Sequence, residues 1–234
     1  MRYNKGNEYS PAAGKELCMH KESLLAYLNA KPELTQMVLR AGSDPDFLNT
    51  LFFIVRTERS TVRYSCTKTI RILSEQQPQA VYPYFDEIAA WLHNTNSFIK
   101  WDGILTLANL VAVDKENRFD LLCEEYLALI RDPQMITAAN VAGNAWKLVQ
   151  ARPEWEPDIT KRLLEVPDIV YLHHGEPSPE CTRVLCGHVL NCFDHYFDES
   201  KRQAEILQFA QNLLDCPRKA VAKSAARFLR QHST

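Results

Sequence analysis

The chain has 234 residues, of which 46% are hydrophobic and 24% are charged, and its formal net charge is -2. These values are ordinary for a globular protein, and they exclude a collagen-like, low-complexity or largely disordered chain. The slightly acidic balance also argues against a nucleic-acid coat or a polybasic membrane binder.

The start of the chain lacks the apolar segment of a secretory signal, and no apolar run approaches the roughly 18 to 20 residues of a membrane span. The 7 cysteines are scattered and form no C-x-x-C pair. This usage is typical of buried thiols in a reducing compartment rather than of a disulfide framework. We therefore expect a cytoplasmic protein that has no contact with a membrane and no cofactor.

Helical periodicity runs through most of the sequence, and no convincing strand pattern interrupts it. Proline marks the junctions Gln77-Pro78, Asp132-Pro133 and Cys216-Pro217, because the residue before proline disfavours helical dihedral angles. Residues 1–19 are expected to be weakly ordered. The predicted helices are 20–30 and 32–41, followed by the pairs 45–57 with 60–76, 80–94 with 97–113, 116–131 with 134–151, 156–166 with 178–197, and 200–215 with 218–231.

The second helices of these pairs resemble one another. The order apolar, variable, variable, polar, small occurs at 62–66, 99–103 and 221–225, and the first two copies start 37 residues apart. A two-helix repeat of this length resembles the HEAT/armadillo-like class. The resemblance implies an all-α, right-handed α-α superhelix over residues 20–234, with second helices lining a concave groove. The segment 165–180 departs from the pattern as an irregular insert, and a single irregular helical bundle is the alternative fold.

The side chains that point away from the apolar face of each second helix form a stripe at spacing i, i+4, i+7. The stripes are expected to tile one continuous polar surface that is basic at its two ends. Amides and hydroxyls in the middle of this surface donate and accept hydrogen bonds, which suits polypeptide backbone. Asparagine is also a poor helix former, so two in one stripe point to a role beyond solubility. The alternative is an ordinary solvent-exposed helix face, which is polar by default. The expected contacts are Tyr64, Lys68, Arg71, Asp102, Thr106, Asn109, Asn140, Asn144, Lys147, His188, Asn191, Lys223, Arg227 and Arg230.

A zinc site is a further hypothesis for the 178–197 helix. Cys181, His188, Cys192 and His195 lie near one line along it, at spacings that allow their side chains to converge. Thiolate and imidazole are ligands that suit Zn²⁺. The alternative is that the cysteines are small core residues.

The sequence contains no G-x-x-x-x-G-K-[ST], G-x-G-x-x-G, H-E-x-x-H or G-x-S-x-G motif. Trp101-Asp102 resembles the Trp and Asp that HEAT-like DNA glycosylases place on groove-lining helices. The groove of that family is lined by Lys and Arg to hold phosphates, and the stripe around Asn140 departs from this pattern.

The sequence thus predicts a non-enzymatic interaction scaffold that binds a protein or peptide segment in the groove, and it does not favour nucleic acid as a partner. The alternative is a HEAT-like DNA glycosylase that acts on alkylated DNA. The insert 165–180 is expected to act as a lid or as a second contact.

Overall fold

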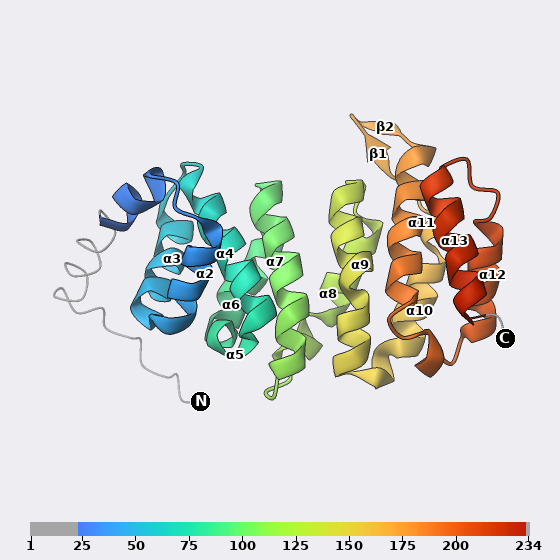
Figure 1. The fold of residues 1–234 in the computed structure, drawn as a ribbon, viewed down its shortest axis with the longest axis horizontal. Coiled ribbons are helices and arrows are strands. Elements are labelled where there is room, and N and C mark those ends of the chain that lie inside the picture. The colour runs from blue at the N-terminus through green and yellow to red at the C-terminus, as the bar shows by residue number, and fades with distance from the viewer. Residues whose placement is uncertain (1–22, 233–234) are drawn as a thin grey trace, which may run out of the picture. The chain divides into compact units, whose positions relative to one another are not determined.

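The computed structural model describes residues 23–232 (Figure 1), so the expectation for residues 1–19 lies outside the described part. Backbone contacts divide the chain into two compact units, with the boundary between residues 80 and 81. Helices make up nearly all regular structure of the described residues. The predicted all-α fold class is therefore confirmed.

The first unit is a small bundle of helices that begins, within the described residues, with a short α-helix at 23–29. The Asp44 side chain caps one of its helices by accepting the N–H of Phe47. The three longest helices pack against one another, and the side chains of Leu51 and Phe52 are fully buried between them. The helices after this short helix are α2 (Leu34–Ser43), α3 (Pro45–Thr57), α4 (Val62–Gln76) and α5 (Pro78–Val81), the last at the unit boundary.

The second unit is built from successive helix pairs, in which a first helix flanked by 3-10 turns precedes a longer second helix. The first helices are α6 (Phe85–Ala90), α8 (Cys123–Ala128), α10 (Glu156–Leu164) and α12 (Gln203–Asn212). The second helices are α7 (Ser97–Leu110), α9 (Met135–Ala151), α11 (Pro179–Phe193) and α13 (Lys219–His232). The 3-10 turns are Tyr82–Tyr84, Trp91–His93, Val111–Val113, Arg118–Leu121, Leu129–Arg131, Pro153–Trp155, Val166–Asp168 and Phe197–Glu199.

The second helices form one layer of this unit. α7 packs on α9, α9 on α11 and α11 on α13, while α8 and α10 lie behind them in the view of Figure 1. Hydrogen bonds at both ends show that α7 and α9 run in the same direction. Trp101 Nε1 donates to Thr137 Oγ1 at 3.1 Å near their N-terminal ends, and Lys147 Nζ donates to Asn109 Oδ1 at 2.7 Å near their C-terminal ends.

Polar contacts at one sequence separation recur along the second unit. Each joins residues that are 38 positions apart. Polar contacts at this one separation therefore link each helix pair to the next. The pairs joined are Asn109 with Lys147, Asp114 with Arg152, Glu124 with Arg162, Glu180 with Arg218, and Asp194 with His232.

Two predicted first helices, 80–94 and 116–131, are broken into short helical segments. In the first, Pro83 lies in a 3-10 turn, because proline removes a backbone donor and disfavours a continuous α-helix. In the second, Asn117 has a φ of 56°, in the left-handed region, so α8 begins only at Cys123. The expectation of two continuous helices was wrong at both places.

The expectation of a chain without strands is wrong at the insert. β1 (Leu172–His173) and β2 (Glu176–Pro177) form a short antiparallel ladder in which Leu172 pairs with Pro177. His174 and Gly175 make the turn, with φ values of 51° and 84°. Two positive φ values are what a two-residue hairpin loop commonly requires. The turn lacks Asn-Gly and Asp-Gly, so its strongest sequence signal was missing.

Candidate functional site

The predicted contact residues of α7 lie on its outward side, with one exception. Asp102 and Asn109 are half-buried, whereas Thr106 has no exposed surface. The Thr106 hydroxyl donates to the carbonyl oxygen of Asp102 at 2.7 Å, so it is satisfied within its own helix. The prediction that Thr106 faces away from the core is wrong, because neighbouring elements cover this side of the helix.

The predicted residues of α9 are half-buried and differ in their bonding. Lys147 reaches sideways to Asn109 on α7, and Asn144 Nδ2 donates to the backbone carbonyl of Asn140 at 2.9 Å. The Asn140 side-chain amide makes no hydrogen bond to any other described residue. It therefore keeps both its donor and its acceptor for a ligand or for water.

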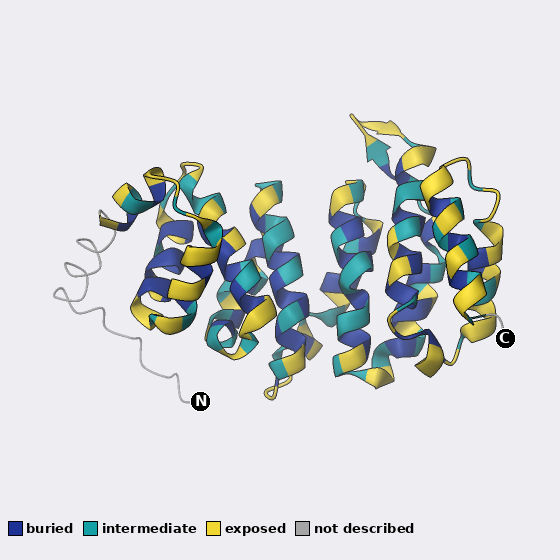
Figure 2. Cartoon of the chain, viewed as in Figure 1, coloured by how far each residue is buried: buried dark blue, intermediate teal, exposed yellow. Residues whose placement is uncertain are grey.

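The predicted residues of α11 and α13 are exposed. A Cβ atom added at Gly143 of α9 would lie 3.6 Å from His188 Nδ1, so α9 and α11 approach closely on this side. Desolvation lowers the pKa of His188 below its ordinary value. Stripes on neighbouring second helices thus adjoin, and half-buried and exposed positions cover the outer side of this layer (Figure 2). We call these residues the stripe face; they are Asp102, Asn109, Asn140, Asn144, Lys147, His188, Asn191, Lys223, Arg227 and Arg230.

The predicted contacts on α4 belong to the first unit. Lys68 is exposed, Tyr64 is half-buried, and half-buried Arg71 forms an ion pair with Glu75 at 3.1 Å. The continuity of these residues with the stripe face stays a prediction.

Two large apolar side chains that continue the stripe face on α7 and α9 were missed by the sequence reasoning. Phe98 is 58% exposed and Ile136 is 47% exposed. They lie four positions before Asp102 and Asn140, so the i, i+4 spacing that selected those residues could also have found them. Phe98 packs edge-on against the half-buried Trp101 ring, with ring centres 5.4 Å apart.

The four candidate zinc ligands are divided between two environments. Cys181 and Cys192 are buried, whereas His188 and His195 are exposed, and the His195 ring stacks on Trp146 at 4.1 Å. Burial raises the pKa of the Cys192 thiol to about 12. Across residues 23–232, no three side chains of metal-ligand type come together.

The expected burial is found at four of the six described cysteines. Cys66, Cys181, Cys186 and Cys192 are buried, and Cys123 and Cys216 are half-buried. Burial raises the pKa of Cys66 and Cys186 to about 12. Their sulfur atoms serve as small apolar core groups rather than as reactive thiolates.

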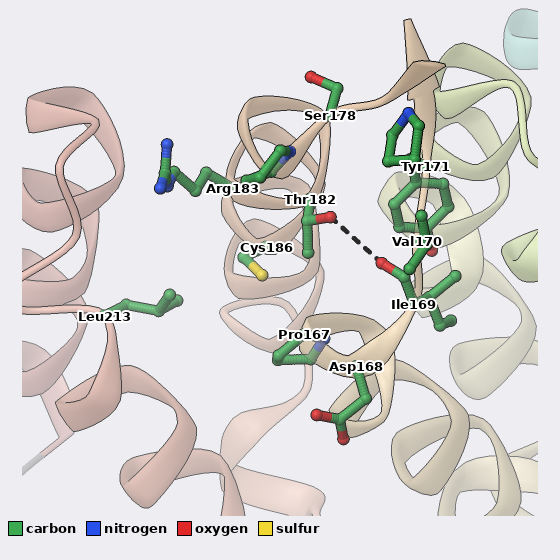
Figure 3. Close-up of a pocket in the computed structure, with 12 residues that line it drawn as sticks. Pro167, Asp168, Ile169, Val170, Tyr171, Ser178, Thr182, Arg183, Cys186 and Leu213 are labelled. Carbon is green, nitrogen blue, oxygen red and sulfur yellow. Dashed lines mark hydrogen bonds between the residues drawn. The ribbon is translucent and has the colours of Figure 1, made fainter. Parts of the chain in front are cut away.

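A cavity of about 430 Å³ lies between the insert, α11 and the C-terminal end of α12 (Figure 3). Thr182 donates to the carbonyl oxygen of Ile169 at 3.2 Å and thus ties the insert to α11. Cys186 and Leu213 line the cavity, and Val170 from the insert is 64% exposed. The sequence reasoning singled out the insert but none of these side chains.

A second cavity of about 430 Å³ lies beside His195 and Tyr196 at the C-terminal end of α11. Its lining includes Glu156, which is only 4% exposed. One carboxylate oxygen of Glu156 accepts from the hydroxyls of Thr160, at 2.8 Å, and Ser200, at 2.6 Å. A buried carboxylate held in this way joins α10 to the turn before α12.

Comparison of the chain with models of known protein families, with curated proteins and with solved structures gave no match. Within the described residues, the helices are too short or too polar to cross a membrane.

Proposed function

We propose that the second unit is a non-enzymatic scaffold that binds an extended protein or peptide segment across its second helices. In this proposal the helix pairs form a HEAT-like, right-handed superhelix, and the stripe face is its concave surface. Repeat proteins commonly bind partners on such extended surfaces.

The observation that carries the proposal is the parallel packing of the second helices. Trp101 with Thr137, and Asn109 with Lys147, hold α7 and α9 side by side in one direction. The stripes of α7 and α9 therefore adjoin, which supports one shared polar surface across the second helices. The unbonded Asn140 amide offers a donor and an acceptor at its centre, which matches the alternating donors and acceptors of a peptide backbone.

The glycosylase alternative requires basic side chains along the surface that meets DNA, since phosphate contacts dominate affinity for nucleic acid. On the stripe face, the arginines lie on α13, and Lys147 is engaged with Asn109. The Trp101 indole N–H is also engaged, by Thr137. These contacts favour a polypeptide as the partner.

Site-specific photo-crosslinking tests the proposal. A photoreactive phenylalanine analogue is placed at Asn140, and in a control variant at Leu121, which is 94% exposed in the turn before α8. In lysate of the source cells, we expect protease-sensitive adducts from position 140 and none from position 121. Nuclease-sensitive adducts from position 140, or release of alkylated bases from duplex DNA by the purified protein, would support the glycosylase instead. Equal labelling from both positions, or none, would overturn the scaffold.

A further inference from the structure

An apolar site adjoins one end of the stripe face. Phe98 and Ile136 are exposed on the first turns of α7 and α9, and Trp101 lies between the Phe98 ring and Thr137. Single exposed apolar residues are common on protein surfaces, but a cluster that includes tryptophan is typical of binding hot spots. The Trp101 indole is already held by its hydrogen bond, so ligand binding would cost little conformational entropy of this side chain.

The other end of the stripe face carries exposed positive charge. Lys223, Arg227 and Arg230 are exposed on α13. Lys223 and Arg230 form no ion pair with another described residue, and Arg227 only reaches Asp194 at 4.0 Å. Arginines elsewhere in the unit are closely paired: Arg118, Arg131, Arg162, Arg202 and Arg218. The cluster on α13 is therefore the one to which a partner's carboxylates are best matched.

The packing of the second helices sets the distance between these two ends. Packed helices lie about 8–10 Å apart, so about two and a half to three steps, counted from midway between α7 and α9 or from α7 itself, reach α13 and span roughly 20–30 Å. An extended peptide advances about 3.3 Å per residue. The two ends are thus spanned by about six to nine residues of extended chain.

We infer that the segment bound by this scaffold is an acidic, extended peptide with an apolar anchor. An aromatic or large aliphatic residue sits over Phe98, Trp101 and Ile136. A cluster of Asp or Glu lies about six to nine residues away along the peptide and pairs with the basic residues of α13. The inference rests on the proposed function, because it names the ligand of the same surface.

Selection from a phage-displayed library of random peptides, about 15 residues long, tests the inference with the full chain as bait. We expect enriched peptides in which an apolar anchor and an acidic cluster are separated by about six to nine residues, in either chain direction. The bait Phe98→Ser/Ile136→Ser should select acidic clusters without the anchor. The bait Lys223→Glu/Arg227→Glu/Arg230→Glu should select basic clusters instead.

Matched control baits carry the same changes at exposed positions away from the stripe face. These are Leu121→Ser, and the triple variant Lys115→Glu/Lys161→Glu/Lys201→Glu. Both should select the same peptides as the unchanged chain, and circular dichroism checks that every bait is folded. A synthetic consensus peptide should bind Phe98→Ser/Ile136→Ser at least about tenfold more weakly, since hot-spot side chains carry most of the binding energy.

The outcomes separate the two proposals. Enriched peptides that lack the paired pattern, or a pattern that the stripe-face variants do not change, would overturn the inference and leave peptide binding intact. The absence of any enriched peptide would overturn both.

Discussion

Lys147 Nζ donates a 2.7 Å hydrogen bond to Asn109 Oδ1 and thereby joins α9 to α7 through residues 38 positions apart. The same separation joins Arg162 to Glu124 on the first helices. Specific polar pairs, as well as apolar packing, therefore hold successive helix pairs in register. The placement of the stripe face depends on this register.

The bond between Lys147 and Asn109 should contribute measurably to the stability of the second unit. Lys147→Met and Asn109→Ala should each lower the free energy of unfolding by about 1 kcal/mol, because the bond is charge-assisted but partly open to solvent. The double variant should lose less free energy of unfolding than the two single variants together, since the partners share one interaction. Denaturant titration measures these values, with exposed Lys161→Met as the control. Strict additivity would contradict the coupling.

Two glycines of the second helices should respond in opposite directions to alanine. A Cβ at Gly103 would lie 2.9 Å from Trp91 Cβ, whereas a Cβ at Gly143 would lie at an ordinary 3.6 Å from His188 Nδ1. We expect Gly103→Ala to destabilise by about 1–3 kcal/mol through overpacking. Gly143→Ala should stabilise by up to about 1 kcal/mol, because alanine has the higher helix propensity. Thermal unfolding of both variants measures these changes in stability. Changes of the same sign would contradict the packing described at Gly103.

Glu156 should stabilise the junction between α10 and the turn before α12. Glu156→Ala leaves the buried hydroxyls of Thr160 and Ser200 without this acceptor, so we expect a loss of about 2–3 kcal/mol. Glu156→Gln retains one acceptor oxygen and should lose less. Exposed Glu154→Gln should change stability by less than about 0.5 kcal/mol. Similar small effects for all three variants in denaturant titrations would show that the carboxylate is dispensable.

His188 should make the protein less stable in acid. Desolvation lowers its pKa in the folded chain below the ordinary value of 6.5, so between these two values the unfolded chain binds more protons. The free energy of unfolding therefore decreases as the pH falls from 6.5 towards the pKa of His188 in the folded chain. His188→Asn should lose less stability than the unchanged chain between about pH 7.5 and about pH 5. Identical losses in denaturant titrations at the two pH values would contradict the shift.

Local sequence determined most of the helices. The prediction of α3 at 45–57 matches Pro45–Thr57, and that of α9 at 134–151 differs from Met135–Ala151 by one residue at its start. Helix periodicity, caps and proline act over a few neighbouring residues, so they can be read without the fold. The breaks at Pro83 and Asn117 were missed, because single residues interrupted segments that were otherwise helical.

Tertiary structure alone decided which outward residues stay accessible. Periodicity places Phe98, Asp102 and Thr106 at successive i, i+4 positions, yet only neighbouring elements determine that Phe98 is exposed and Thr106 is covered. Likewise, the cavity beside Cys186 and Leu213 exists because the insert folds back on α11, a contact between distant parts of the chain. A helix pattern records which side chains share a face, whereas burial depends on which other helices pack against that face.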